Sequence, residues 1–327
     1  MNIATIGTGM IVDRFLSALE SIEDAKCVAM YSRKESTAKP LAEKYNINSI
    51  YTELDGMLND SAVDFVYVAS PNSLHYEHTY RALQGGKNVI CEKPFTSTLK
   101  ELESLMSLAK RKSLMLFEAI TTIHLPNFKI IKENLTKLGT IKFIQCNYSQ
   151  YSSKYDRLLN GETPNVFNPK FSGGALTDIN IYNLHFTMNL FGKPKAINYT
   201  ANQHPNGIDT SGVLVLKYSG FIGECVGCKD TRSMNFALIQ GEKGYIHVEN
   251  GANGCQKVIL HTDDEEATLN VQTESNPLYY EVLAFNNIYK SSDIEKCYEL
   301  LDYSHSVIHM LEEARMDAGI VFEADTH

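Results

Sequence analysis

The sequence predicts an α/β protein with two domains: a doubly wound parallel sheet, then an α+β domain with a large, open, mainly antiparallel sheet. Residues 1–120 alternate short apolar runs with helical patterns, whereas later strands follow one another through short turns. A chain of 327 residues is also longer than the chains that usually fold around one hydrophobic core. We expect domains at 1–120 and 121–327, and allow for the C-terminal helix packing back on the first domain.

In the first domain, strands and helices are predicted in strict alternation. The predicted strands are Ile3–Ile6, Cys27–Tyr31, Phe65–Ala69, Asn88–Ile90 and Leu114–Phe117. The predicted helices are Asp13–Leu19, Ser36–Tyr45, Glu77–Leu83 and Leu99–Lys112. Parallel strands need long crossover connections, which are usually helices, so this order is typical of a parallel sheet.

The second domain is predicted to be rich in strands. They are Ile141–Tyr148, Ile197–Ala201, Gly212–Tyr218, Phe221–Cys228, Phe236–Gln240 and Tyr245–Val248, with helices at Asn127–Leu138, Leu278–Lys290 and Ser304–Ala318. Ser219-Gly220 reads as a hairpin turn between two of these strands. Alternating apolar residues on one sheet face favour self-association as a homodimer or higher oligomer.

Composition argues against several partners. There are 30 lysines and arginines against 39 acidic residues, a net charge of −9, so nucleic-acid binding is not expected. Lys110-Arg111-Lys112 falls where a helix should end and complements its dipole. No apolar run approaches the roughly 18 residues of a membrane span. Seven scattered cysteines fit a reducing cytoplasm.

Cys225 and Cys228 form a single CxxC motif without a second pair. Zinc binding is the weaker interpretation and two ordinary strand residues the stronger one, so no metal is predicted.

The segment Gly7-Thr8-Gly9-Met10-Ile11-Val12 lies between a buried strand and a helix. The first two glycines of a dinucleotide fingerprint are present, and Val12 replaces the third, which serves helix packing. In a Rossmann domain the amides of this turn face a pyrophosphate. We predict that Gly7, Thr8, Gly9, Met10 and Ile11 contact the cofactor; the alternative is an ordinary turn between strand and helix.

The second strand ends in Ser32-Arg33-Lys34 without the acidic residue that binds the ribose hydroxyl of NAD. A hydroxyl and a guanidinium suit a 2′-phosphate. The sequence therefore favours NADP over NAD, with Ser32 and Arg33 as contacts; otherwise Arg33 is a solvated residue at a helix start.

Lys93 lies between Glu92 and Pro94 at the end of a predicted parallel strand, the edge where open α/β sheets bind ligands. Its ammonium could polarise a carbonyl or donate a proton. A cis Lys93-Pro94 bond would aim this side chain into a cleft. The competing interpretation is a surface lysine paired with Glu92.

The segment 172–186 reads SGGALTDINIYNLHF. Asp178, Tyr182 and His185 follow one another at i, i+4 and i+7 on the predicted helix, which places a carboxylate, a phenol and an imidazole on one face. We predict Tyr182 and Asp178 as catalytic and His185 as a substrate contact. The alternative is a buried network of the same three groups, and a metal site is disfavoured.

Residues 152–171 form a long polar and aromatic loop before that helix. Such a loop shapes a substrate pocket more often than not, so we predict Tyr155, Arg157 and Phe167 as lining residues.

Five motifs occur in a characteristic order: GTGMI, SPNSLH (70–75), CEKPF, FEAI (117–120) and SGGALTDINIY. On these motifs the chain resembles the glucose–fructose oxidoreductase / inositol dehydrogenase (Gfo/Idh/MocA) family along nearly its whole length. The resemblance implies a Rossmann domain and a second domain whose sheet commonly forms a dimer interface. It further implies that Ser70, Asn72, His75 and Glu92 line the nicotinamide side, that Lys93 is the catalytic lysine, and that Asp178 and Tyr182 occupy the family's Asp and His/Tyr positions.

Some positions depart from the family pattern. Asn180 replaces a usual glycine, Ser172 the first of three glycines, and His185 a frequent acid. After Glu118-Ala119 many relatives carry an arginine, which is absent here, so the substrate cannot be carried over.

Taken together, the sequence predicts an NADP- or NAD-dependent oxidoreductase that transfers a hydride between nicotinamide and a secondary alcohol or ketone of a sugar, cyclic polyol or diol. In this hypothesis Lys93 and Tyr182 converge on one nicotinamide ring. The alternative is a cofactor-bound sensor on the same scaffold without turnover.

Overall fold

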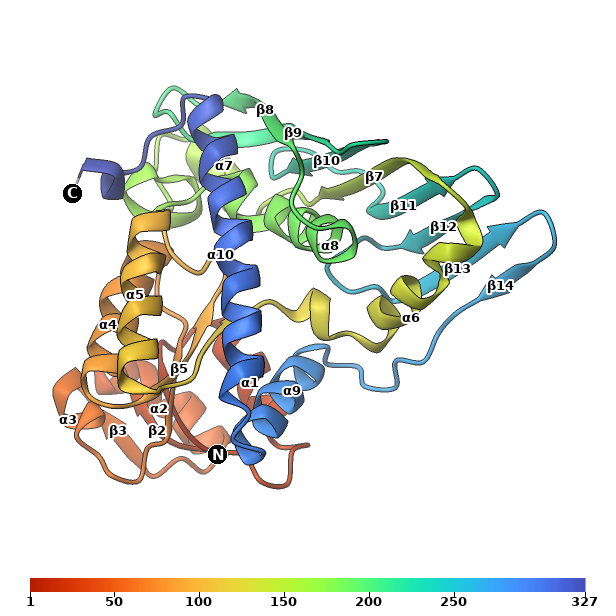
Figure 1. Ribbon diagram of the computed structural model, residues 1–327. Helices are drawn as coiled ribbons and strands as arrows, with labels where there is room; N and C mark the ends of the chain where they lie inside the picture. Colours follow the sequence, from red (N-terminus) through yellow and green to blue (C-terminus); the bar gives the residue numbers. More distant parts are fainter. Residues whose placement is uncertain (327) are drawn as a thin grey trace. The chain divides into compact units, whose positions relative to one another are not determined.

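A computed structural model describes residues 1–326 of the chain, which form two compact units (Figure 1). The first unit contains residues 1–119 and 274–305, and the second contains 120–273 and the residues from 306 onward. The segment carrying α9 (Leu278–Lys290) therefore belongs with the first unit, although it follows every strand of the second in the sequence.

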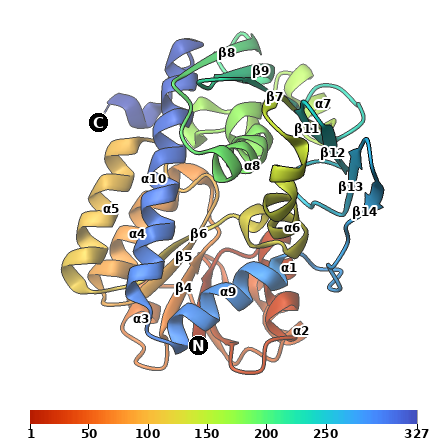
Figure 2. The same ribbon diagram turned by 45° about the vertical axis from the view of Figure 1, so that its right-hand side comes forward.

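The first unit holds a six-stranded parallel sheet in the order β3-β2-β1-β4-β5-β6. The strands are β1 (Asn2–Ile6), β2 (Lys26–Tyr31), β3 (Ser49–Tyr51), β4 (Phe65–Val68), β5 (Asn88–Glu92) and β6 (Leu116–Ala119). The helices are α1 (Met10–Leu19), α2 (Glu35–Lys44), α3 (Leu54–Leu58), α4 (His75–Gln84) and α5 (Leu99–Lys112). As Figure 2 shows, α4 and α5 cover one face of the sheet, and α1 and α9 cover the other. The predicted doubly wound parallel sheet is confirmed.

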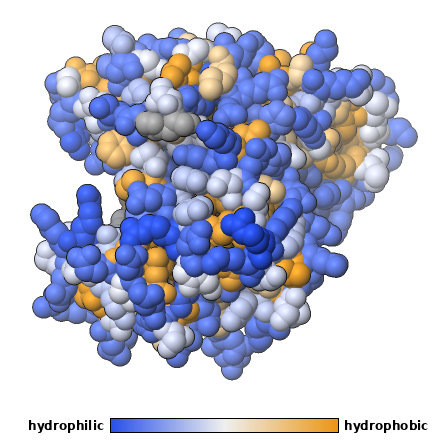
Figure 3. All heavy atoms as spheres, turned by 60° about the vertical axis from the view of Figure 1, so that its left-hand side comes forward, coloured by the Kyte–Doolittle hydropathy of each residue, from blue (hydrophilic) through white to orange (hydrophobic). Residues whose placement is uncertain are grey.

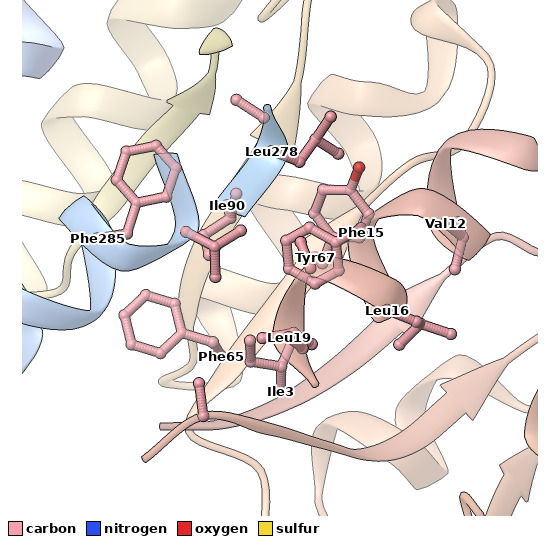
Figure 4. Close-up of a cluster of buried hydrophobic side chains, with 14 of the residues drawn as sticks. Ile3, Val12, Phe15, Leu16, Leu19, Phe65, Tyr67, Ile90, Leu278 and Phe285 are labelled. Atoms are coloured by element: carbon pink, nitrogen blue, oxygen red, sulfur yellow. The ribbon is translucent and has the colours of Figure 1, made fainter. Parts of the chain in front are cut away.

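An aromatic cluster fills the space between this sheet and the helices α1 and α9 (Figure 4). Phe65 and Tyr67 alternate on β4 and so point to the same face. The Tyr67 ring stacks on Phe15 of α1 with centroids 3.7 Å apart, and Phe117 stacks on Phe285 of α9 at 4.5 Å. Such ring pairs add to the free energy gained by burying their apolar surface. This packing fixes the position of the carboxyl ends of β4 and β5 in the sheet.

The second unit is built on an eight-stranded sheet in the order β14-β13-β12-β11-β7-β10-β9-β8. The strands are β7 (Ile141–Ser149), β8 (Ala196–Gln203), β9 (Asp209–Lys217), β10 (Ile222–Cys228), β11 (Phe236–Gly241), β12 (Gly244–Glu249), β13 (Lys257–Thr262) and β14 (Glu266–Thr268). Only β7 and β10 run parallel among the described neighbours, and the rest are antiparallel. This confirms the predicted, mainly antiparallel sheet.

One face of this sheet is buried beneath α8 (Ile181–Phe191), which packs on β7 and β10 (Figure 1). The opposite face keeps apolar side chains at alternating positions, partly or fully exposed: Phe143, Val213, Val215, Ile222, Val226, Phe236, Leu238, Tyr245 and Ile259. By contrast, the face of the molecule in Figure 3 is mainly hydrophilic, with hydrophobic residues in small groups.

Several elements differ from the sequence-based prediction. The strands β3, β13 and β14 and the helix α3 were not expected, nor was the helix α7 (Tyr155–Leu159) inside the predicted 152–171 loop. The helix α10 (Ile294–Asp317) begins ten residues before its predicted start. The helix α6 (Pro126–Asn134) continues to Leu138 only as a 3₁₀ turn. Apart from β13, the unexpected elements have three to five residues and are too short to show a hydrophobic period.

The end of the described chain is held by a buried ion pair. Arg315 of α10, 1% exposed, contacts both carboxylate oxygens of Asp325 at 2.6 Å. No helix among residues 1–326 is both long and apolar enough to cross a bilayer.

Candidate active site

The turn between β1 and α1 leaves the N-terminus of a helix open. Gly7 has φ of +119°, and a side chain there would also come within 2.6 Å of the carbonyl oxygen of Ala69, which follows the neighbouring strand β4. Gly9 is the N-cap residue of α1, and no atom from another part of the chain lies within 4 Å of the place that a Cβ would occupy on it. The first amides of α1 thus face open space at the positive end of the helix dipole, as a pyrophosphate requires.

A cleft of about 750 Å³ opens at this turn, at the carboxyl ends of β1, β2 and β4. Six of the predicted cofactor contacts line it: Gly7, Thr8, Gly9, Ser32, Arg33 and Ser70. Eight further lining residues were not predicted: Ile6, Tyr31, Lys34, Thr37, Ala69, Pro71, Leu74 and His78. The remaining predicted contacts, Met10, Ile11, Asn72, His75, Glu92 and Lys93, are not among the residues that line this cleft.

The end of the cleft beside β2 suits a phosphate dianion. The Ser32 and Thr37 hydroxyls lie 2.5 Å apart, and Thr37 also donates to the Lys34 carbonyl oxygen. Arg33 and Lys34 supply two cations, and none of the described lining residues is acidic. The residues present therefore fit a dinucleotide with a 2′-phosphate, because a carboxylate at this place would repel that group.

The ring of His75 lies between two backbone carbonyl groups. Its side chain is buried, with Nδ1 2.9 Å from the Pro94 carbonyl oxygen and Nε2 2.9 Å from the Ser70 carbonyl oxygen. Burial lowers the pKa of His75 to about 4. His75 thus ties the segment after β4 to the residue after Lys93. His78, one turn later, is the histidine that lines the cleft, and its Nδ1 lies 2.9 Å from the Ser70 hydroxyl oxygen.

Glu92 is the last residue of β5, and its carboxylate is held by a side chain of the first unit. The Tyr67 hydroxyl donates a 2.5 Å hydrogen bond to Glu92 Oε1. Burial raises the pKa of Glu92, although this hydrogen bond opposes the shift. Glu118 is buried on the adjacent strand, opposite Cys91. Lys93 follows directly, is partly exposed, and is joined to Pro94 by a cis peptide bond, as expected.

In the second unit, Gly173 and Gly174 allow the start of the helical segment to fit into its surroundings. A side chain on Gly173 would lie 2.5 Å from the Val166 carbonyl oxygen, and one on Gly174, whose φ is +109°, would collide with the Asp209 carboxylate. That buried carboxylate accepts hydrogen bonds from the Leu176 amide and the Tyr199 hydroxyl, both at 2.7 Å. Burial raises the pKa of Asp209.

The residues Leu176–Asn180 then form a π-helical turn that leads into α8. Such turns occur often at functional sites. Asp178 lies in it, and its carboxylate is hydrogen-bonded to the ammonium of Lys229. Tyr182 lies one turn later, with its ring 5.9 Å from that of Tyr148 at the end of β7. Asp178 and Tyr182 are partly exposed.

The other predicted substrate contacts have different surroundings. His185 and Phe167 are fully buried, and the Phe167 ring packs at 5.8 Å from that of Tyr155, so Phe167 supports the loop from inside. Arg157 is half-exposed and pairs with Glu162. Tyr155 is partly exposed. Contact of any of these residues with a substrate stays a prediction.

Sequence reasoning missed Tyr67, His78 and Lys229. His78 carried one signal, because it lies three residues after His75 in the sequence. Cys225 and Cys228 are free thiols, Cys225 buried and Cys228 partly exposed. Within residues 1–326 no group of three or more histidines, cysteines or acids could hold a metal ion.

Comparison with known proteins decides the family. Residues 1–120 match the oxidoreductase family with an NAD-binding Rossmann fold, and residues 131–247 match the GFO/IDH/MocA C-terminal domain. The chain belongs to the Gfo/Idh/MocA oxidoreductase family. The resemblance found in the five sequence motifs is thereby confirmed.

Similar members of the Gfo/Idh/MocA family extend over the whole chain. The scyllo-inositol 2-dehydrogenase (NADP(+)) of Bacillus subtilis (strain 168) is 36% identical, with 98% of each chain covered. The human trans-1,2-dihydrobenzene-1,2-diol dehydrogenase is 25% identical, covering 98% of this chain and 97% of that protein. A 3-ketoreductase from Actinomadura kijaniata, solved with NADP and TDP-benzene, shares the fold with a TM-score of 0.84, 20% identity and 97% coverage of both chains.

Proposed function

We propose that this protein is an NADP-dependent dehydrogenase or reductase that interconverts a secondary alcohol and a ketone on a sugar, cyclic polyol or related diol. The observation that carries this proposal is the cleft lined by Arg33 and Lys34 next to the β1–α1 turn, in a Gfo/Idh/MocA chain that retains Lys93, Asp178 and Tyr182. The NADP-dependent inositol dehydrogenase at 36% identity supports both the cofactor and the polyol class.

We assign cofactor binding to the first domain. The amides of Gly7, Thr8, Gly9, Met10 and Ile11 would hold the pyrophosphate, and Ser32 and Arg33 the 2′-phosphate. Ser70, Asn72 and Glu92 would lie toward the nicotinamide. His75 acts there indirectly, through the Ser70 and Pro94 carbonyl groups that it contacts. When bound, the nicotinamide supplies or accepts the hydride.

The protein residues manage the hydroxyl proton in this proposal. In the oxidation direction Tyr182 acts as a phenolate, which takes the proton from the substrate hydroxyl and becomes a phenol, and the Lys93 ammonium stabilises the negative charge that develops on oxygen. In reduction Tyr182 returns the proton. Asp178 accepts a hydrogen bond from a substrate hydroxyl and so orients the carbon that reacts. Tyr155, Arg157 and His185 remain candidates for shaping the substrate pocket, with Phe167 supporting Tyr155 from the protein interior.

We further propose that the second domain, residues 121–327, binds substrate and makes a cytoplasmic homodimer through the exposed face of its sheet. Val215, Ile222 and Tyr245, each more than a third exposed, lie on that face. A contiguous exposed apolar surface of this kind is typical of an association surface.

A cofactor-reduction screen tests the proposed function. Purified protein is mixed with NADP or NAD and a panel of sugars, inositols and diols, including scyllo-inositol, and absorbance of the reduced nicotinamide is followed. The proposal predicts turnover with at least one polyol or sugar and a preference for NADP. Tight NADP binding without oxidation or reduction of any member of a broad alcohol and carbonyl panel would contradict it.

A further inference from the structure

Lys229 is a nearly buried lysine directed at the carboxylate of Asp178. It follows β10, its side chain is 6% exposed, and its ammonium forms an ion pair with Asp178 Oδ2. The Asp178 side chain itself is 32% exposed. The cation is therefore withdrawn from solvent, while the acid that it contacts still faces outward.

The backbone of Lys229 is fixed on both sides. Its amide donates to the Thr210 carbonyl oxygen at 2.8 Å, and its carbonyl oxygen accepts from the Ser152 amide at 2.8 Å. The next acid, Asp230, accepts hydrogen bonds from the hydroxyls of Thr210 and Ser211. These contacts anchor Lys229 between β9 and the first residue of the 152–171 loop.

Burying an ammonium costs several kcal/mol unless a counter-charge compensates for the loss of water. An exposed ion pair on the same sheet, Lys257–Glu249, carries no such cost because both side chains are more than a third exposed. A buried lysine set against a partly exposed acid is thus a poor source of stability, which indicates a functional use of this pair.

We propose that Lys229 is a positioning residue that acts through Asp178: it holds this carboxylate ionised and oriented as the acceptor for a substrate hydroxyl. The role of Asp178 toward substrate rests on the proposed function. The coupling between Lys229 and Asp178 does not, because it follows from their contact.

Other titratable groups lie on the elements that pack against the π-helical turn, namely α8, β7, β9 and β10. They are Tyr182 and His185 of α8, Lys142, Cys146 and Tyr148 of β7, Asp209 and Lys217 of β9, and Glu224, Cys225 and Cys228 of β10, followed by Asp230. Lys142 and Lys217 are exposed, and Lys142 pairs with Glu242, whereas Lys229 is the lysine that contacts Asp178. Removing it should change the charge seen by Asp178 more than any other single substitution there.

Kinetics test the positioning role if the protein turns over a polyol. The variant K229M should raise KM for the alcohol about tenfold or more and change the Kd of NADP less than twofold. In a D178N background the same K229M change should raise KM for the alcohol less than about twofold, because the carboxylate through which Lys229 acts is already gone. An equal rise in KM on K229M substitution in wild type and in D178N, or no rise in either, would overturn the proposal.

A titration by ¹³C NMR tests the coupling without any turnover. Protein labelled at its aspartate carboxyl carbons is titrated, and the Asp178 signal is identified by its absence in D178N. In K229M the titration midpoint of Asp178 should move up by about one to three pH units, the range for loss of an adjacent opposite charge. The control K257M should leave it unchanged.

An unchanged Asp178 midpoint in folded K229M would refute the coupling even if the enzyme is active. Conversely, a shifted midpoint in a protein that turns over nothing would leave the coupling intact and refute the proposed function. If K229M does not fold, K229Q, which keeps a polar side chain at the site, is used for the same two measurements.

Discussion

The Tyr67 hydroxyl donates a 2.5 Å hydrogen bond to the Glu92 carboxylate, one residue before Lys93. Tyr67 is itself held by its stack on Phe15 in the core of the first unit (Figure 4). This hydrogen bond therefore ties the end of β5 that carries Lys93 to the aromatic core.

Substituting Tyr67 with Phe keeps the stack on Phe15 and removes the hydrogen bond. The free energy of unfolding should fall by about 1–3 kcal/mol, the cost of leaving a buried acceptor without its donor. Urea denaturation followed by circular dichroism measures this. The matched control is Tyr51→Phe, which removes a 2.9 Å hydrogen bond to the partly exposed Asp60 and should cost clearly less. Equal decreases in the free energy of unfolding of the two variants would show that the Tyr67 hydrogen bond stabilises the fold no more than the Tyr51 hydrogen bond does.

Arg33 should decide between the two nicotinamide cofactors. Arg33→Ala should weaken NADP binding about ten- to hundredfold, the value of one or two charge-assisted hydrogen bonds, and leave NAD binding nearly unchanged. Fluorescence titration of both cofactors gives the ratio. Arg14→Ala is the control, because Arg14 is an exposed residue of α1 outside the lining of the cleft. An unchanged NADP-to-NAD ratio in Arg33→Ala would remove Arg33 from the assignment.

His75 should make stability depend on pH. Its pKa is about 4 in the folded protein, below the ordinary value of 6.5, because burial disfavours the charged imidazole. The unfolded chain therefore binds a proton that the folded chain does not between about pH 6.5 and pH 4. Stability contributed by this group is present above pH 6.5 and is lost as the pH falls to 4, by roughly 3 kcal/mol in total.

Comparing wild type with His75→Gln isolates this contribution, because all other titrating groups are shared. The difference in unfolding free energy between the two proteins should shrink on acidification from pH 6.5 to 4. Stability curves that stay parallel over this range would show that His75 titrates normally.

Long elements with a clear period could be predicted from the sequence. The helices α5 and α9 begin and end at their predicted residues, and α5 carries both the Thr98–Glu101 capping box and the basic last turn. The β1–α1 turn was recognisable because glycines are required by both the close approach of Ala69 and the positive φ of Gly7.

The polar contacts that build the site could not be predicted in the same way. Lys229 follows a CxxC motif that suggested at most a metal, and its pairing with Asp178 depends on β10 lying beside the π-helical turn. A helix of regular period would place Asp178, Tyr182 and His185 on one face, yet His185 is fully buried while Asp178 and Tyr182 stay partly exposed. The spacing alone does not tell which part of such a face the rest of the chain covers. Tyr67 reads in the sequence as one more apolar strand residue.

The most direct test of the central claim is a double-mutant cycle on Lys93 and Tyr182, measured as kcat/KM for a polyol accepted in the screen. Lys93→Met and Tyr182→Phe should each lower the rate by about 10²–10⁴-fold, with the Kd of NADP nearly unchanged. The two residues manage one proton, so the double variant should lose little more than the worse single variant. Retained turnover in either single variant, or losses that simply multiply in the double variant, would contradict the proposal that an amine and a phenol act together on one substrate hydroxyl.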